Sequence, residues 1–197
     1  MKSDVYLPVL CECFPYLDAN DLASLTTIMR VETLRKKEVF ISPGEFRPKV
    51  ALIIRGMIRG YFINEFGEEK TVFLSSERLF VGAPEAAFKN MPTKYCFSAE
   101  NESVLLVFDF DTLKNMGCHH PNISRLIYDA LSEIVFILTQ RLESLIDNSP
   151  QSRYEKLIND QPHFFQQAFH KHLANYLGIS PVSLSRIIKR KIQSPKN

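Results

Sequence analysis

The longest regular pattern of hydrophobic and polar residues runs from residue 121 to residue 147. Pro121 suits the first turn of a helix, and Asn148-Ser149-Pro150 ends it. Two apolar stripes follow helical spacing, the first being Ile123, Ile127, Ala130, Ile134 and Ile137, and the second Leu131, Val135, Leu138, Leu142 and Leu145. A helix that covers one domain needs a single apolar face. The stripes therefore predict two partners, the protein's own body and the same helix of a second subunit in a coiled-coil dimer interface. Burial of the helix inside one chain is the alternative.

Between residues 39 and 108 the pattern changes to short apolar segments separated by turn residues. The segments that favour strands are 39–41, 50–54, 57–63, 70–74, 96–99 and 104–108. Residues 65–68, Glu-Phe-Gly-Glu, are typical of a hairpin loop. A helix of about residues 18–30, capped by Asp18 or Asn20, precedes the strands. At least six short, evenly spaced strands with helices on either side predict an α+β protein built on an antiparallel β-barrel or jelly roll.

Residues 170–189 fit the pattern of a helix-turn-helix. Ala174 is small where two helices would cross, Gly178 lies where the turn needs a positive φ, and Ser180-Pro181 is a typical helix start. The apolar contacts between the helices would come from Leu173, Leu177, Leu184, Ile187 and Ile188. The opposite side of the second helix carries Val182, Ser183, Ser185, Arg186, Lys189 and Arg190. Such a polar and basic face suits a helix in a DNA major groove, and a helical hairpin without DNA contact is the alternative.

The distribution of charge supports DNA binding. The 197 residues have a formal net charge of +2. From residue 151 onward, eight Lys and Arg, Lys196 among them, stand against two Asp and Glu, which gives +6. The first 150 residues hold 16 Lys and Arg against 20 Asp and Glu, which gives −4. A basic C-terminal segment on an acidic body is typical of a nucleic-acid-binding protein, although a solvated basic helix has the same composition.

Composition and motifs exclude several other classes. A hydrophobic share of 45% and a charged share of 23% are ordinary for a globular protein. The apolar runs are far shorter than the ~20 residues that span a bilayer, and acidic residues interrupt the N-terminal segment. We therefore expect no membrane partner, no signal peptide and a cytoplasmic location. No nucleophile-elbow, Walker or dinucleotide-binding motif occurs, so we expect no catalytic residues and no enzyme activity.

Cysteine and histidine spacing argues against a metal, an iron–sulfur cluster or haem. Cys11 and Cys13 are too close for a C-x2-C site, and Cys96 and Cys118 form no second pair. No histidine falls between residues 38 and 108, so the predicted barrel lacks the ligands of a cupin-type enzyme or a haem site. A cupin-like or ligand-binding regulatory barrel protein without DNA binding is the alternative function.

A barrel, a long helix and a terminal helix-turn-helix in this order resemble the Crp/Fnr family of bacterial transcription regulators. The segments that carry the resemblance are Pro43-Gly44-Glu45, the hairpin residues 66–70, and residues 176–187, which are close to the form in Bacteroidetes-like members. The resemblance implies a cyclic-nucleotide-binding-like sensor domain at residues 1–117, a dimerisation helix at 118–149 and a DNA-binding domain at 150–197. It also implies double-stranded DNA and a second copy of the chain as partners, with RNA polymerase and a small-molecule effector as further ones.

The resemblance assigns roles to individual residues. Arg186 is similar to the family arginine that reads a base edge, where a bidentate contact to guanine is usual. Lys171, on the first helix, lies where the family contacts a backbone phosphate. Ser180, Val182, Ser183, Ser185, Lys189 and Arg190 complete the candidate DNA-binding set. Pro181 and Val182 stand where better-known activators place an arginine-glutamate pair, so the operator sequence does not carry over.

The effector segment departs from the family pattern. Members that bind cyclic AMP hold its ribose with a Gly-Glu pair and its phosphate with an Arg-Ser pair. Here Gly82 is retained, but Ala83 stands at the glutamate position and Thr93-Lys94 at the arginine-serine position. Glu85 is displaced by two residues, and a lysine lacks the planar fork that grips a phosphate. These departures argue against cyclic AMP binding and leave Gly82, Ala83, Glu85, Thr93 and Lys94 as candidates for the pocket of another effector.

Overall fold

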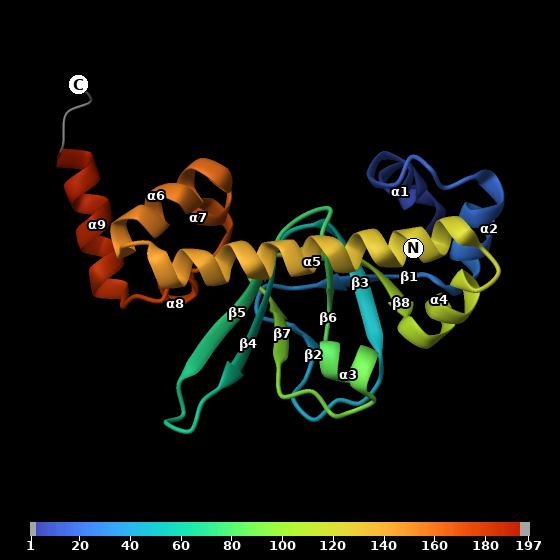
Figure 1. Ribbon diagram of the computed structural model, residues 1–197, viewed down its shortest axis with the longest axis horizontal. Helices are drawn as coiled ribbons and strands as arrows, with labels where there is room; N and C mark the ends of the chain where they lie inside the picture. The colour runs from blue at the N-terminus through green and yellow to red at the C-terminus, as the bar shows by residue number, and fades with distance from the viewer. Residues whose placement is uncertain (1–2, 194–197) are drawn as a thin grey trace.

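The computed structural model describes residues 3–193, and its shape follows one long helix. Helix α5 (Pro121–Asp147) spans most of the length of the molecule, with a β-barrel against its middle (Figure 1). The N-terminal helices lie at one end of the barrel and the C-terminal helices at the other. Among the described residues, no helix is long and apolar enough to cross a membrane.

Two four-stranded sheets form the barrel, and the strand pairings are antiparallel. In spatial order, the first sheet holds β1 (Arg30–Leu34), β8 (Ser103–Asp109), β3 (Lys49–Arg55) and β6 (Phe80–Gly82). The second holds β2 (Val39–Ile41), β7 (Cys96–Ala99), β4 (Ile58–Ile63) and β5 (Glu69–Ser75). The predicted α+β class and antiparallel jelly roll are confirmed. Strands β1 and β6 are additions to the six segments expected. β1 begins two residues after α2 ends, within the range assigned to that helix.

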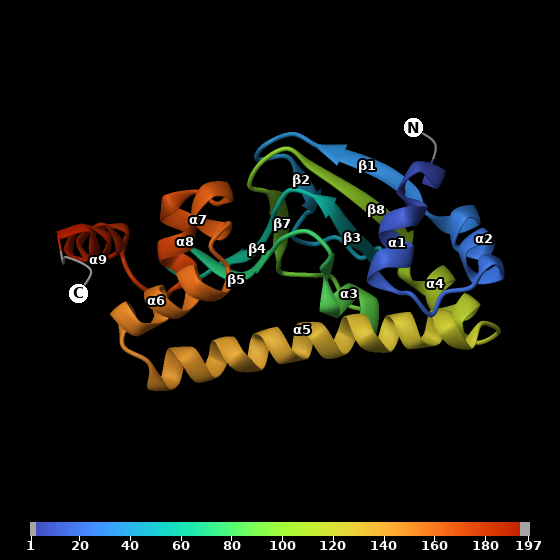
Figure 2. The same cartoon turned by 90° about the horizontal axis from the view of Figure 1, so that it is seen from above.

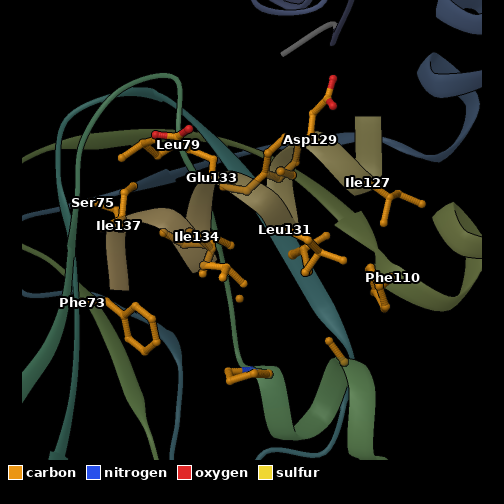
Figure 3. A pocket seen from close by; sticks show the side chains of 18 of the residues that line it. Phe73, Ser75, Leu79, Phe110, Ile127, Asp129, Leu131, Glu133, Ile134 and Ile137 are labelled. Atoms are coloured by element: carbon orange, nitrogen blue, oxygen red, sulfur yellow. The ribbon is translucent and has the colours of Figure 1, made fainter. Parts of the chain in front are cut away.

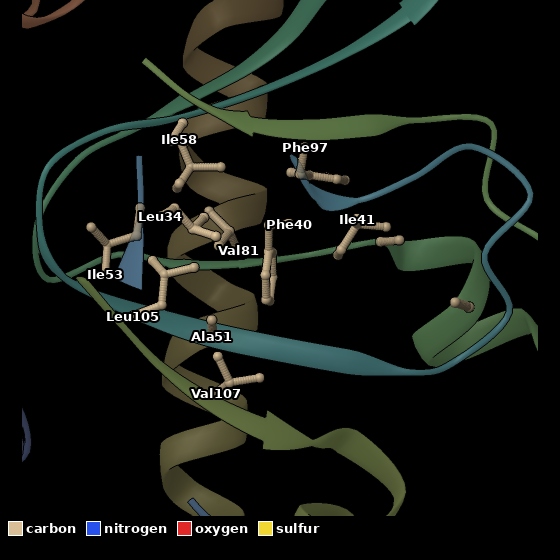
Figure 4. Close-up of a cluster of buried hydrophobic side chains, with 13 residues drawn as sticks. Leu34, Phe40, Ile41, Ala51, Ile53, Ile58, Val81, Phe97, Leu105 and Val107 are labelled. Carbon is tan, nitrogen blue, oxygen red and sulfur yellow. The ribbon is translucent and has the colours of Figure 1, made fainter. Parts of the chain in front are cut away.

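The barrel core explains the continuous apolar runs of β3 and β8. Ala51 and Ile53 of β3 and Leu105 and Val107 of β8 point into the space between the sheets (Figure 4). The alternate residues, such as Leu106, pack in a second buried cluster against the N-terminal helices and α5. Because successive side chains of a strand point to opposite faces, a strand that is buried on both faces is apolar throughout.

Four short helical segments flank the barrel next to the start of α5. They are η1 (Ser3–Tyr6), α1 (Leu7–Cys13), α2 (Ala19–Ile28) and α4 (Phe110–Gly117). Asp18 caps α2 by accepting hydrogen bonds from the backbone N–H groups of Asn20 and Asp21, and Asp21 accepts from the N–H of Asp18. This capping box selects Asp18 over Asn20 as the helix start. Helix α3 (Pro84–Lys89) follows β6 and packs against β3 of the barrel.

Helix α5 has the bounds that the sequence predicts. The first stripe packs toward the barrel: Ile123 is fully buried, and Ile127, Ala130 and Ile134 pack on the same apolar cluster. In the second stripe, Val135 and Leu142 are more than half exposed, whereas Leu131 and Leu138 are half-buried and line the space between α5 and the barrel. Figure 2 shows no other element along the outer side of the helix. Within the described residues, burial of α5 inside a single chain is therefore wrong.

The C-terminal helices form a small domain that packs on the barrel. They are α6 (Pro150–Asp160), α7 (Phe164–Gln167), α8 (His170–Tyr176) and α9 (Pro181–Gln193). Their core contains Tyr154, Leu173 and Leu184, and the same buried cluster includes Met57 and Leu74 from the barrel. The helical domain and the barrel thus share apolar contacts, and α9 is the element farthest from the barrel (Figure 2).

Candidate nucleic-acid interface and effector cavity

Helices α8 and α9 are joined by the turn that the sequence places at Gly178. Gly178 has a φ of +69°, in the left-handed region that favours glycine. The hydroxyl of Ser180 accepts a hydrogen bond from the N–H of Ser183 at 3.1 Å and so caps α9. The expected inter-helix contacts are formed by Leu173, Ala174, Leu177, Leu184 and Ile187, which are buried, with Ile188 packed against them. The predicted helix-turn-helix and its internal contacts are confirmed.

The outer face of α9 carries the candidate base-reading residues. The side chains of Val182, Ser185, Arg186, Lys189 and Arg190 are exposed on this helix. Within residues 3–193, no carboxylate lies within 4 Å of Arg186 or Lys189 as an ion-pair partner. Ser183 differs from these residues, because it is half-buried and its hydroxyl lies 2.9 Å from that of Ser180. The geometry offers the cationic side chains of Arg186 and Lys189 on a helix that projects from the molecule.

Two other cations of the basic segment lie elsewhere. Lys171 is exposed on the first turn of α8, close enough to Glu69 of the barrel that its charge helps to lower the pKa of that carboxyl group. Burial is the largest single influence on the pKa of Glu69 and raises it, but the hydrogen bond and charge of Arg59 and the charges of His172 and Lys171 together outweigh burial and lower the pKa. Lys196 lies outside the described residues.

A cavity of about 650 Å³ separates the barrel from α5 (Figure 3). Its walls are mainly apolar side chains from β5, β6, α3, α4 and α5, including Phe73, Phe110 and Ile134. The charged side chains that line it are Arg78, Asp129 and Glu133. Arg78 already pairs with Glu12 at 2.9 Å, and Asp129 accepts a hydrogen bond from the hydroxyl of Tyr16 at 2.7 Å. The cavity therefore offers a large apolar surface and few unpaired charges.

The five effector candidates divide into two groups. Gly82 and Ala83 line the cavity, as the resemblance implies. Glu85, Thr93 and Lys94 are not among its lining residues. Glu85 instead accepts a hydrogen bond from the hydroxyl of Thr93 at 3.2 Å, and the ammonium of Lys94 lies over the rings of Phe62 and Tyr95.

Sequence reasoning missed most of the cavity wall. Its residues come from segments far apart in the chain, so no local signal marks a cavity. It is also lined by three residues that the sequence assigns to the dimer interface, Leu131, Val135 and Leu138. Phe73 is expected in a strand, and Ile134 and Ile137 belong to the stripe that packs toward the barrel. Only their arrangement in space leaves a void between them.

The second apolar stripe of α5, predicted as the dimer interface, includes one residue more than the five assigned to it from the sequence. Tyr128 is 75% exposed and lies seven residues before Val135, which lies seven before Leu142. Leu131, Leu138 and Leu145 repeat with the same period, three residues after each of these positions. The seven-residue spacing of Tyr128 from Val135 is a sequence signal that could have identified it. Residues with this spacing stay on the same side of a supercoiled helix.

Several solved structures have a fold similar to that of this chain. No protein-family model matches the sequence, and no curated protein matches it. FixK2 from Bradyrhizobium japonicum has a TM-score of 0.71 at 11% identity, over 83% of this chain and 84% of that chain. The c-di-GMP responsive global regulator CLP from Xanthomonas campestris has a TM-score of 0.71 at 14% identity, over 91% and 96% of the two chains. A transcriptional regulator of the Crp/Fnr family from Eubacterium rectale has a TM-score of 0.69 at 13% identity, over 91% and 87%.

These similarities define the class to which the fold belongs. A cyclic-nucleotide-binding-like barrel, a long helix and a terminal helix-turn-helix, in that order, form the fold of Crp/Fnr-type regulators. The resemblance drawn from the sequence is confirmed for the fold along most of the chain. The alternative of a ligand-binding regulatory or cupin-like barrel protein without DNA binding is not favoured, because the similarity to these chains extends over the C-terminal helices as well as the barrel.

Proposed function

We propose that this protein is a sequence-specific, DNA-binding regulator of transcription. The observation that carries the proposal is the exposed face of α9, where Arg186 and Lys189 project from a correctly capped and packed helix-turn-helix. A major groove accepts one helix, and an arginine can make a bidentate contact with a guanine. As part of this proposed function, we place the protein in the cytoplasm and expect no catalytic activity.

We propose that a second copy of the chain packs along the outer stripe of α5. A seven-residue apolar repeat on a 27-residue helix, with Tyr128, Val135 and Leu142 exposed, supports a two-stranded coiled coil. With this dimer, we propose that the chain has three parts: a sensor at residues 1–117, a dimerisation segment at 118–149 and a DNA-binding domain at 150–197. Two copies of α9 would then enter successive major grooves about 34 Å apart, on a palindromic site. Contact with RNA polymerase remains a prediction from the resemblance.

We infer that the cavity between the barrel and α5 takes an apolar effector and not a cyclic nucleotide. A phosphate needs a cation, and the one arginine that lines the cavity, Arg78, pairs with Glu12. Lys94, at the position of the family's phosphate-binding pair, lies outside the cavity wall. CLP is responsive to c-di-GMP, whose two phosphates would require more positive charge than this cavity presents.

The central test selects binding sites from random DNA with the purified protein and then compares variants on the selected operator. Arg186→Ala should lose discrimination at one base pair of each half-site, a loss of about 1–3 kcal/mol. Arg47→Ala is the matched control, because Arg47 is an exposed arginine in the loop between β2 and β3, and this variant should bind as wild type does. Equal operator affinity of Arg186→Ala and wild type would overturn the assignment of α9 as the reading helix.

A further inference from the structure

The side chain of Asn175 occupies the free edge of a β-sheet. β5 is the last strand of its sheet, so its outer edge has no neighbouring strand. The Oδ1 atom of Asn175 accepts a hydrogen bond from the N–H of Thr71 at 2.5 Å, and its Nδ2 atom donates to the carbonyl oxygen of Glu69 at 2.8 Å. The side-chain amide thus bonds the N–H of one residue of β5 and the carbonyl oxygen of the residue two positions before it. The backbone of a neighbouring strand would bond the same two groups. Helix α8 of the helix-turn-helix is thereby attached to the backbone of the barrel.

Arg141 of α5 binds the same stretch of β5. Its guanidinium donates to the carbonyl oxygens of Thr71, at 2.8 Å, and of Val72, and also to that of Tyr176 at 3.1 Å. The guanidinium lies over the ring of Tyr176, 4.3 Å from its centroid. Burial lowers the pKa of Arg141, which shows that this cation is held away from water. One side chain thus connects the long helix, the barrel edge and the C-terminal end of α8.

β5 also forms part of the cavity wall. Phe73 and Ser75, two and four residues beyond Thr71, line the cavity between the barrel and α5. Leu79, in the loop that follows β5, lines this cavity and also a second one of about 410 Å³ between α5 and the C-terminal helices. The strand therefore contacts the cavity through its side chains and the helix-turn-helix through its edge.

We propose that Asn175 is a positioning residue that fixes the orientation of the helix-turn-helix on β5. Together with Arg141 it makes β5 the element through which a change in the cavity reaches α9. This role rests on the proposed DNA-binding function. It predicts that loss of Asn175 leaves the helix-turn-helix folded but loosens α8 on β5. Among the described residues, the remaining hydrogen bonds hold α8 through Glu100 and Arg141, and none of them joins α8 directly to the backbone of β5.

The first test uses no DNA. Amide hydrogen exchange is measured on the full-length protein, wild type and Asn175→Ala. The Thr71 amide should exchange at least about tenfold faster in the variant, since its hydrogen-bond acceptor is gone. The amides of Leu177, bonded to Leu173, and of Arg78, bonded to Ile53, should keep their wild-type rates and so show that α8 and the barrel are folded. Unchanged exchange at Thr71 would overturn the proposal.

Two further variants sharpen the exchange measurement. Asn175→Asp keeps an acceptor for the Thr71 amide but loses the donor to Glu69, so its Thr71 exchange should lie between those of wild type and Asn175→Ala. Gln151→Ala removes an exposed side-chain amide on α6 that binds Glu155 of the same helix, and it should exchange as wild type does at Thr71. If Asn175→Ala does not fold, Asn175→Asp decides the question, and wild-type exchange at the Thr71 amide in that variant counts against the proposal.

The second test measures binding to operators whose half-sites are moved apart or together by one or two base pairs. Each base pair rotates one half-site by about 35° relative to the other. Wild type should prefer one spacing, and Asn175→Ala should bind all spacings with nearly equal affinity. A uniform loss at every spacing would mean a merely structural role and would overturn the proposal. If wild type binds no DNA, the proposed function fails, whereas the exchange of the Thr71 amide still decides whether Asn175 holds α8 on β5.

Discussion

The carboxylate of Glu100 lies 2.7 Å from Nδ1 of His172, across the contact between the barrel and α8. Its other oxygen accepts a hydrogen bond from the backbone N–H of Phe169 at 2.8 Å. Glu100 is 1% exposed, so both of its oxygens are satisfied by the helical domain and not by water. This pairing adds charged hydrogen bonds to the apolar contacts that join the two parts of the molecule.

Glu100→Gln should destabilise the protein by about 1–3 kcal/mol. The substitution replaces one of two buried carboxylate oxygens, which contact the N–H of Phe169 and Nδ1 of His172, by an amide NH2 group that cannot accept a hydrogen bond. Chemical denaturation measures the change in the free energy of unfolding. Glu102→Gln is the control: Glu102 is exposed and pairs with Arg55 on the surface, so its loss should cost less than about 1 kcal/mol. Equal stabilities of the two variants would contradict the role given to Glu100.

Asp21 should make stability depend on pH at the acid end. Burial raises the pKa of this carboxyl group, but hydrogen bonds from Asn122, the N–H of Asp18 and His120 outweigh burial and hold the pKa below its ordinary value of 3.8. A group whose pKa is lower in the folded state stabilises the fold above the unfolded pKa, and this stabilisation disappears as the pH falls through the folded pKa.

Asp21→Asn should therefore be less stable than wild type at pH 7, and the difference should shrink below about pH 4. Urea denaturation at a series of pH values measures it. Asp111→Asn, which alters an exposed carboxylate in the first turn of α4, should keep the wild-type acid dependence. A constant difference between Asp21→Asn and wild type across this pH range would show that Asp21 does not act through its charge.

The dimer interface can be tested with two substitutions on one helix. Leu142 and Phe136 are exposed to similar extents, 58% and 61%, but only Leu142 belongs to the seven-residue repeat. Leu142→Asp should dissociate the dimer, because it places two carboxylates in an apolar seam, whereas Phe136→Asp should leave the dimer intact. Sedimentation equilibrium gives the masses. A monomeric wild type, or dissociation by both variants, would show that the seam is not the interface.

The effector preference of the cavity between the barrel and α5 can be tested by melting. A ligand that binds only the folded state raises the melting temperature of the protein. The uncharged fluorophore N-phenyl-1-naphthylamine should therefore raise the melting temperature, whereas cyclic AMP should leave it unchanged. Ala87→Phe, which fills the cavity from α3, should abolish binding of the fluorophore. Ala23→Phe adds the same ring to an exposed site on α2 and should bind as wild type does. Stabilisation by cyclic AMP would overturn the inference of an apolar effector.

The sequence by itself determined the elements whose signals are local. Pro121 and the Asn-Ser-Pro segment set the bounds of α5, Gly178 and Ser180 set the turn and the start of α9, and the first stripe of α5 marked the side that packs on the barrel cluster. Each of these signals depends on backbone conformation or helical periodicity, which residues a few positions apart decide.

Only the tertiary structure decided the cavity and the attachment of the helix-turn-helix to the barrel. Asn175 and Thr71 are 104 positions apart, and neither residue carries a mark in the sequence that it will meet the other. The elements that enclose the cavity likewise come from separate parts of the chain. An asparagine near the end of a helix and a threonine in a strand are ordinary in both places. Their relationship arises because sheet topology leaves β5 at an edge, and because backbone groups at an edge bind whatever donor and acceptor the packing brings to them.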